Sequence, residues 1–213
     1  MLDSPPVLSR RERRKLEVRG RILEAAIGLF DAQGYAATKV SEISDRADVA
    51  HKTFFNHFPT KQHLLQAIAE HAMDEQLAGI ENLRQQPAPT RERLVRLFDW
   101  IADRSEEAGA MRPELVHEII RFTHANAPGG EARKLHDAFA GIVRDGLEAG
   151  DVTREHEEET LVEMLMGAYY AVMLNWTSFG GYPLRERAGA AGRFLASAIA
   201  VEPEPPSRTR GDR

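Results

Sequence analysis

Residues 38–58 read TKVSEISDRADVAHKTFFNHF and contain two short helical patterns separated by a tight break. Thr38 is suited to cap the first helix, which carries Val40 and Ile43 and is expected to end near Ala47. Asp48 and the next residue form the break, and a second short helix is predicted over about 50–57. Two short helices joined by a turn of three or four residues are typical of a helix-turn-helix.

The second helix has one outward-facing arc. At about 100° per residue, His51, Lys52, Phe55 and Asn56 fall within about 140°, whereas Phe54 points to the other side. Lysine can donate to guanine or phosphate, and asparagine can pair with adenine in the major groove. The arc therefore predicts contact with DNA bases; a surface helix of an ordinary bundle is the alternative.

Helical periodicity continues on both sides of this unit. A helix is predicted over about 16–33, with Gly34 at its C-terminal cap, and Thr60 is suited to cap a long helix. Further helices are predicted at about 91–108, 112–126, 131–149, 155–179 and 184–200. No stretch has the alternation of a strand with a hairpin turn, so the sequence predicts an all-α fold of about nine helices.

Charge is distributed unevenly along the 213 residues, whose net charge is −5. Residues 1–61 hold 11 Lys/Arg against 8 Asp/Glu, and 10–21 alone hold 7 against 2. This basic run, which includes Arg14, could lie along DNA phosphates, enter the minor groove as an arm, or be a solvated helix start.

Composition also limits the function. The absence of cysteine fits a reducing cytoplasm, and no apolar stretch is long enough to span a membrane. Since no phosphate-binding glycine loop, serine-hydrolase motif or complete zinc-protease motif occurs, we expect no enzyme activity, no metal site and no cofactor.

Residues 22–65 resemble the DNA-binding domain of TetR-family transcriptional regulators. The matching positions are an apolar-Ala-Ala-apolar-Phe helix, Gly34-Tyr35, Thr38, Val40, Ile43, Ala47-x-Val49, Thr53, His57-Phe58 and Lys61-x-x-Leu64-Leu65. The resemblance implies that Thr38 and Lys61 contact phosphate and that the recognition helix reads bases. With the basic run, the predicted DNA-contacting residues are Arg14, Thr38, His51, Lys52, Thr53, Phe55, Asn56, His57 and Lys61.

Four positions depart from the family pattern. Asp48 replaces the glycine of the turn, and Ala50 replaces a capping serine, at a cost of about 1 kcal/mol. Lys52 replaces a glycine, and Phe55 replaces a tyrosine whose hydroxyl often bonds phosphate. Phe55 could instead pack against sugar or a thymine methyl.

For the rest of the chain the resemblance implies a helical-bundle domain for ligand binding and dimerisation. The predicted organisation is a flexible N-terminus (1–9), a helix-turn-helix domain (10–65), the ligand-binding and dimerisation domain (66–200) and a disordered tail (201–213). Ligand-binding candidates, each of which could equally be ordinary core, are Phe98, Met111, Phe122, Phe139, Met166, Tyr169, Tyr170 and Met173. Candidates for the dimer interface, in a helix rich in alanine and glycine, are Ala191, Phe194, Leu195 and Ala198.

The resemblance thus predicts a cytoplasmic homodimeric repressor that a small, largely apolar inducer of unknown identity releases from a palindromic operator in double-stranded DNA. An activator or ligand-independent regulator of the same fold, and a helical adaptor that no longer binds DNA, are the alternatives. The departures at Asp48, Ala50 and Phe55 keep the adaptor open.

Overall fold

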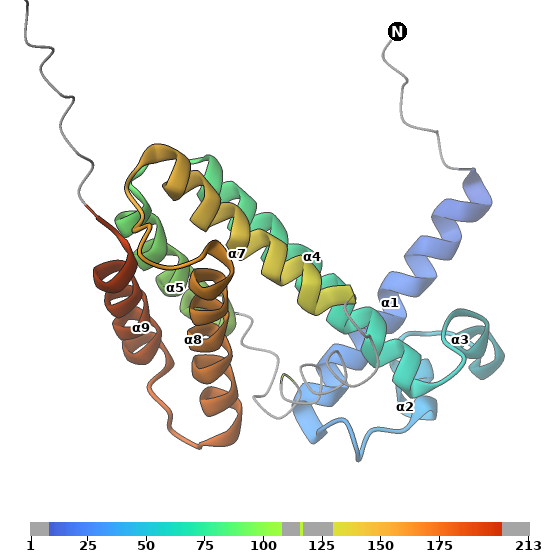
Figure 1. Cartoon of the computed structure of the whole chain (residues 1–213). Coiled ribbons are helices and arrows are strands. Elements are labelled where there is room, and N and C mark those ends of the chain that lie inside the picture. The colour runs from blue at the N-terminus through green and yellow to red at the C-terminus, as the bar shows by residue number, and fades with distance from the viewer. Residues whose placement is uncertain (1–8, 108–115, 117–129, 202–213) are drawn as a thin grey trace, which may run out of the picture. The chain divides into compact units, whose positions relative to one another are not determined.

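The computed structural model describes residues 9–107, 116 and 130–201, and these residues form helices joined by short loops (Figure 1). The helices are α1 (Arg10–Gln33), α2 (Val40–Arg46), α3 (His51–His57), α4 (Lys61–Gln85), α5 (Thr90–Glu107), α7 (Gly130–Ala149), α8 (Glu158–Ser178) and α9 (Leu184–Ile199). The predicted all-α class is confirmed. The helix predicted at 112–126 lies outside the described residues.

Contacts divide the chain into two compact units within α4, between His71 and Ala72. The first unit is described over residues 9–71 and at 116, and the second over 72–107 and 130–201. None of the helices described here combines the length and apolarity needed to cross a lipid bilayer.

The first unit is built around one apolar core to which α1, α2, α3 and the start of α4 contribute. Ile22 and Phe30 from α1, Ile43 from α2, Phe54 from α3 and Leu64 from α4 are fully buried in it. Burying a side chain of this size stabilises the fold by about 1.5–3 kcal/mol. The two short helices are therefore held by packing, because helices of seven residues have little stability of their own.

Capping interactions fix the helix ends of this unit. Gly34 ends α1 with a φ of 84°, and the Thr60 hydroxyl accepts the His63 N–H at 3.2 Å at the start of α4, both as predicted. α1, however, begins at Arg10 rather than near Leu16. Its N-terminus is a capping box: the Ser9 hydroxyl accepts the Glu12 N–H at 3.2 Å, and the Glu12 carboxylate accepts the Ser9 N–H at 2.7 Å.

In the second unit, α9 packs mainly against α5, and α8 packs against α7 and α9. The α5–α9 approach is close because α9 presents small residues to α5. A Cβ atom added to Gly192 would lie 3.0 Å from the Phe98 Cβ and 3.2 Å from the Leu94 carbonyl oxygen. Ala188 and Ala196, on the same face, are buried.

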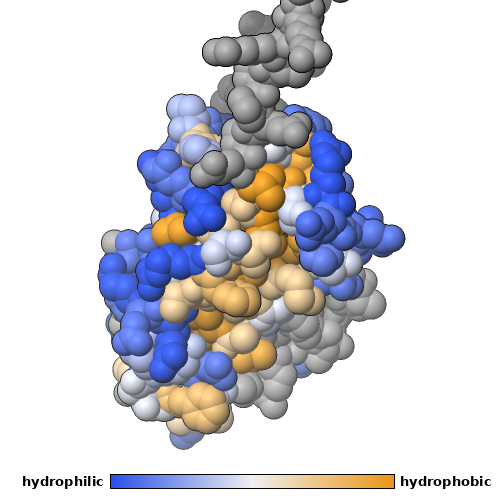
Figure 2. Space-filling model, turned by 60° about the vertical axis from the view of Figure 1, so that its left-hand side comes forward, coloured by the Kyte–Doolittle hydropathy of each residue, from blue (hydrophilic) through white to orange (hydrophobic). Residues whose placement is uncertain are grey.

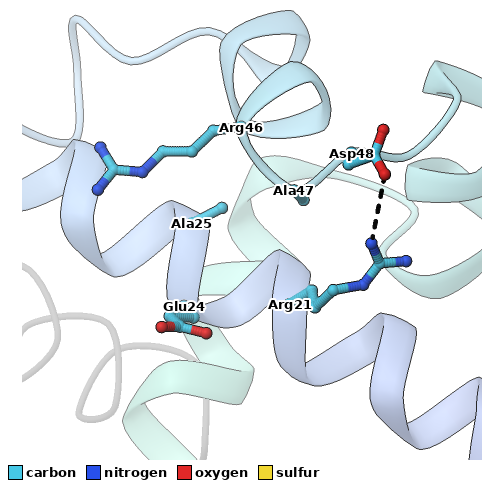
Figure 3. Close-up of a pocket in the computed structure, with 6 residues that line it drawn as sticks. All are labelled: Arg21, Glu24, Ala25, Arg46, Ala47 and Asp48. Atoms are coloured by element: carbon cyan, nitrogen blue, oxygen red, sulfur yellow. Dashed lines mark ion pairs between the residues drawn. The ribbon is translucent and has the colours of Figure 1, made fainter.

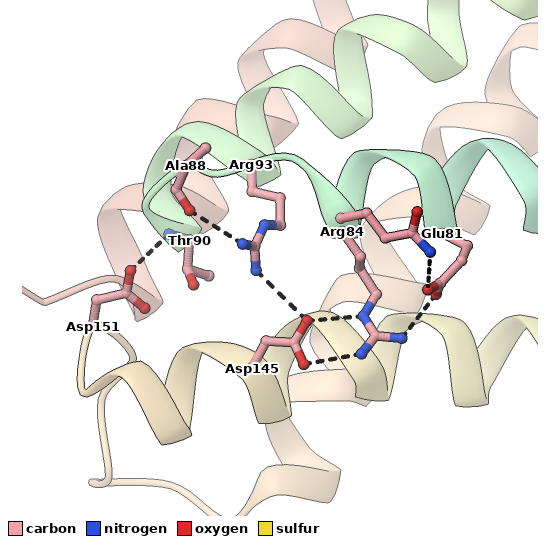
Figure 4. A network of polar contacts seen from close by, with 8 residues as sticks. Glu81, Arg84, Ala88, Thr90, Arg93, Asp145 and Asp151 are labelled. Carbon is pink, nitrogen blue, oxygen red and sulfur yellow. Dashed lines mark hydrogen bonds and ion pairs between the residues drawn. The ribbon is translucent and has the colours of Figure 1, made fainter.

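A polar network joins the C-terminal ends of α4 and α7 (Figure 4). The Arg84 guanidinium donates two hydrogen bonds of 2.9 Å to the Asp145 carboxylate, which Arg93 also approaches at 3.7 Å. The hydrogen bonds from Arg84 keep the pKa of Asp145 below its ordinary value. Nearby, the Asp151 carboxylate accepts the buried Thr90 N–H at 2.8 Å, which satisfies a backbone donor at the start of α5.

Candidate DNA-binding site

The outward face of α3 has the composition that the periodicity predicted. His51, Lys52, Phe55 and Asn56 are exposed, whereas Phe54 is fully buried. The His51 and Phe55 rings meet edge to face, with 5.0 Å between their centroids. This contact orders two of the four outward side chains, and Phe55 remains 42% exposed. The arc thus presents an imidazole, an ammonium, an amide and an aromatic ring to the solvent.

The turn before α3 tolerates its two unusual residues. Asp48 adopts a φ of 52°, the left-handed conformation that the turn requires, and Ala50 begins α3 without a side-chain cap. The Asp48 carboxylate lies 3.8 Å from the Arg21 guanidinium of α1. This pair is exposed to solvent and contributes little to stability, so the packing of Phe54 and Phe58 holds the turn in place.

Beside this turn, α1 and the end of α2 enclose a shallow depression of about 300 Å³ (Figure 3). The charged residues that line it carry both signs, and the apolar lining consists of two alanines. Its lining residues are Arg21, Glu24, Ala25, Arg46, Ala47 and Asp48. A depression of this composition is unsuited to the apolar ligand that the sequence predicted.

Thr53 and His57, the other two candidates on α3, are half-buried on its flanks. Burial lowers the pKa of His57 below its ordinary value of 6.5, and the positive charges of Lys15 and Arg19 lower it further. The buried His57 Nδ1 atom lacks a hydrogen-bond partner among the described residues. His57 is therefore held neutral beside the basic part of α1.

Thr38 differs from its prediction. Lys39 is the N-cap of α2, and the Glu42 carboxylate accepts the Lys39 N–H at 2.9 Å. Thr38 itself is 2% exposed, and its hydroxyl donates to the Gly34 carbonyl at 2.8 Å. It closes the loop between α1 and α2 and does not present its hydroxyl to the surface, so neither the predicted cap nor a phosphate contact fits its position.

Lys61 is also engaged inside the protein. Its ammonium donates to the carbonyl oxygens of Tyr35 at 2.7 Å, Thr38 at 2.9 Å and Ala36 at 3.4 Å, and it lies 4.4 Å from the centroid of the Tyr35 ring. Burial lowers the pKa of Lys61. Three carbonyl partners use all three ammonium protons, so Lys61 fastens the loop between α1 and α2 to the start of α4, in place of the predicted phosphate contact. Its spacing gave no sign of this role.

Arg14 is exposed on the N-terminal turns of α1, whose residues 10–17 are all exposed. Since these turns are helical, the basic run from Arg10 onward is not the extended arm that one prediction allowed. Arg19, which the sequence did not single out, stacks on the ring of Phe58 with its guanidinium 4.4 Å from the centroid. It connects the basic run to the end of α3.

The ligand-binding candidates divide into three groups. Phe98, Phe139, Tyr169 and Met173 are buried, Met166 and Tyr170 are half-buried, and Met111 and Phe122 lie outside the described residues. The Tyr169 hydroxyl donates to the Gln76 side chain at 3.2 Å, and burial raises the pKa of Tyr169 to about 12. The buried members pack as core residues do, so a ligand cavity among them stays a prediction.

The dimer candidates lie on two different faces of α9. Leu195 is 4% exposed within its own chain, so it belongs to the core and is not available to a second subunit. Gly192, one of the small residues of this helix, packs against α5. Phe194 is 70% exposed, Ala198 is exposed and Ala191 is half-buried, and all three lie on the face that points away from α5.

Apolar side chains are also exposed on α8, which packs against α9. Met164 and Leu174 of α8 are 55% and 39% exposed. Figure 2 looks at this side of the molecule and shows apolar side chains gathered in a band bordered by hydrophilic ones. Large exposed apolar patches of this kind are typical of protein interfaces.

The family described as bacterial regulatory proteins of the tetR family matches residues 22–68, the segment that forms the first-unit core and α3. The chain is 44% identical over 144 residues to the HTH-type transcriptional repressor KstR of Mycobacterium tuberculosis, a match that covers 65% of this chain and 61% of that protein. It is 32% identical over 94 residues to the HTH-type transcriptional activator FasR of Mycolicibacterium smegmatis, which covers 42% of this chain and 43% of that protein. Both matches span less than two thirds of the relative's length.

Among solved structures, FadR of Thermus thermophilus is a TetR-family transcriptional repressor in complex with lauroyl-CoA. It superposes with a TM-score of 0.63 at 25% identity, covering 89% of this chain and 98% of that one. Residues 22–68 thus match the tetR family model, and the curated relatives and this shared fold point to the same family of bacterial regulatory proteins.

Proposed function

We propose that this protein is a sequence-specific DNA-binding transcriptional regulator that acts as a homodimer in the cytoplasm. The main observation in support is the outward arc of α3. Its four side chains are exposed to solvent, while Phe54 on the other side of the helix is buried in the core. An α-helix fits the major groove of B-form DNA, where each base pair presents a distinct pattern of donors and acceptors.

The roles on α3 follow from the side-chain chemistry. Asn56 can form a bidentate pair with adenine, and Lys52 can donate to guanine or to a phosphate. Phe55 can pack against a thymine methyl group, supported by the ring of His51. Thr53 and His57, half-buried on the flanks, would contact the sugar–phosphate backbone.

Dimerisation through the exposed face of α8 and α9 would give the complex a twofold axis. A twofold dimer reads a palindrome whose half-sites lie about 34 Å apart, one turn of the DNA helix. The exposed Phe194, Ala198, Met164 and Leu174 support this interface.

We further propose that the regulator is a repressor released by a largely apolar small molecule that binds in the second unit. Aromatic and methionine side chains gather there, and such side chains suit an adaptable apolar pocket. Release requires that the ligand bind one arrangement of the two DNA-reading heads more tightly than the other. Acyl-CoA thioesters are the first class to test, since FadR of Thermus thermophilus holds lauroyl-CoA.

A salt series of gel shifts with DNA from upstream of the protein's own gene tests the proposal. We expect DNA binding to weaken steeply as the salt concentration rises. Asn56→Ala should relax the sequence preference at one base pair per half-site, and lauroyl-CoA should reduce the DNA affinity. A chain without salt-sensitive DNA binding would instead be a helical adaptor.

An activator is the second candidate, favoured by the match to FasR. A reporter gene behind the same upstream DNA separates the two. Deleting the regulator raises the expression of a repressed reporter and lowers the expression of an activated one.

A further inference from the structure

Arg11, Arg14 and Lys15 form a basic stripe on the first turns of α1. Residues 10–17 are exposed throughout, and the buried part of the helix begins only at Ile22. At 1.5 Å per residue, the eight residues before Val18 extend roughly 12 Å along the helix axis. The stripe therefore stands on a part of α1 that no core packing requires.

The three side chains share one face of the helix. At about 100° per residue they fall within an arc of about 100°, and the same arc continues into Val18 and Ile22, which pack into the core. Arg13 points to the opposite side, and Arg10 lies outside the arc at its flank. The basic stripe thus faces the same side of α1 as α2 and α3.

The stripe begins beside the end of the recognition helix. One turn further along α1, Arg19 stacks on Phe58, the residue that ends α3, with 4.4 Å between the guanidinium carbon and the ring centroid. Lys15 is close enough to His57 to help lower the pKa of that imidazole. A polymer that contacts the exposed arc of α3 would therefore meet the stripe next.

Acidic side chains do not neutralise the stripe. Glu12 and Glu17 are the acidic residues of the segment 10–21. The Glu12 carboxylate accepts the Ser9 N–H in the capping box at 2.7 Å, and Glu17 lies outside the arc of the stripe, about 60° from Arg14 around the helix. The capping box also keeps the first turn helical, so the stripe is ordered before any partner arrives.

We propose that this basic stripe binds the sugar–phosphate backbone of duplex DNA just outside the base pairs that α3 reads, whatever the flanking sequence. The inference rests on the proposed function, because it places the stripe next to a recognition helix that is already bound. Its chemistry suits phosphates: three cations on one face of a preformed helix, with no neutralising acid among them, match a polyanion and lack the shape needed to read bases. An extension of roughly 12 Å corresponds to about three or four base pairs.

The test compares Arg11→Ala/Arg14→Ala with Arg10→Ala/Arg13→Ala in the full chain. Both variants lose two exposed arginines from the same turns, so net charge and helix propensity change equally. The probe is the duplex that the full chain selects from a random-sequence pool, prepared with long flanks and with the outer four base pairs removed from each end.

We expect the stripe variant to bind the long duplex about tenfold more weakly at 0.1 M salt, and its slope of log affinity against log salt to fall by about 2 per protomer. The control should stay near wild type. Trimming the flanks should weaken wild type and control but not the stripe variant, and replacing the flanking sequence at constant length should change nothing.

Equal behaviour of the two variants would overturn the inference while leaving the proposed function intact, since the wild type would still select a specific duplex. The stripe variant could also bind the trimmed and long duplexes as wild type does but no longer sediment with phosphatidylglycerol vesicles. This result would assign the stripe to a membrane surface and would also overturn the inference. A wild type that selects no duplex would instead refute the proposed function.

Discussion

At the scale of single residues, the structure separates side chains that face outward from those that hold the scaffold. Asn56 and Lys52 are free to contact a partner, whereas Thr38 and Lys61 are bonded to backbone carbonyls of the loop between α1 and α2. Spacing along the chain cannot make this distinction, because a lysine at a helix start can reach outward to an anion or inward to carbonyl groups with equal ease.

Lys61→Ala distinguishes these two roles. Because its three carbonyl partners would lose their donor, we expect the free energy of unfolding to fall by about 1–2 kcal/mol. DNA affinity should fall with an unchanged salt slope. Urea unfolding and salt-dependent gel shifts measure both. The control is Lys52→Ala, which removes an exposed ammonium and should leave stability unchanged. If Lys61→Ala instead keeps wild-type stability and lowers the slope of log affinity against log salt by about 1, then Lys61 contacts a phosphate as first predicted.

His57 gives the first unit a dependence on pH. Its folded-state pKa is depressed, so the unfolded chain binds the proton more readily, and its contribution to stability is complete above about pH 6.5. We expect the free energy of unfolding to decline as pH falls from 7 through the folded-state pKa. Replacing His57 with glutamine should flatten this decline in denaturation curves taken between pH 5 and 7.5, whereas replacing the exposed His51 should not. Identical pH profiles for wild type and His57→Gln would contradict this account.

At the scale of helices, close packing in the second unit depends on residues without bulk. Gly79 of α4 faces Trp100 of α5, and a Cβ atom at residue 79 would lie 2.0 Å from the Trp100 Cζ2 atom. The indole ring therefore occupies the space that any other residue would need, and the approach of these two helices is set by this pair.

We expect Gly79→Ala to lower the free energy of unfolding by about 1–3 kcal/mol, although alanine is the better helix former. In a Trp100→Leu background the same change should be neutral or stabilise by up to about 1 kcal/mol, because the ring is gone. A double-mutant cycle by chemical denaturation gives the coupling. Equal effects in both backgrounds would show that the ring does not set the approach.

The sequence predicted some elements well and others poorly for identifiable reasons. The arc of α3 was predicted correctly, because a short amphipathic helix has a single way to bury Phe54. The start of α1 was missed because residues 10–17 lack apolar periodicity, although the Ser9–Glu12 capping box was present in the sequence. Of the residues of α9 assigned to a second subunit, Leu195 is buried within its own chain. The richness of α9 in small residues indicates close packing of another helix but does not identify that helix, which is α5 at Gly192.

At the scale of the whole molecule, the two candidate binding surfaces lie in different units. The first unit contains the helix-turn-helix, and the second contains the exposed apolar residues of α8 and α9. The sequence of the first unit was enough to predict the fold and the resemblance to a family. The helix faces of the second unit could not be predicted in this way, because tertiary packing decides which face is buried.

Phe194→Glu tests the proposed dimer. A carboxylate at this exposed apolar position would be buried without a partner in a twofold interface, so we expect a monomer that stays folded and binds a palindromic duplex much more weakly. Analytical ultracentrifugation and circular dichroism measure the two properties. Ala78→Glu, which adds a carboxylate to an exposed position on α4, is the control. A Phe194→Glu chain that still sediments as a dimer would move the interface elsewhere.

The anchoring of α3 has one consequence for how such a protein diversifies. Phe54 of α3 and Phe58 at its end are fully buried in the core of the unit, and among the described residues the outward side chains add ring contacts at its surface. The four outward residues can therefore be exchanged together while the fold beneath them stays intact. Libraries randomised at these positions should yield folded proteins with new DNA sequence preferences. The chain is therefore a suitable scaffold for engineering regulators that bind other target sequences.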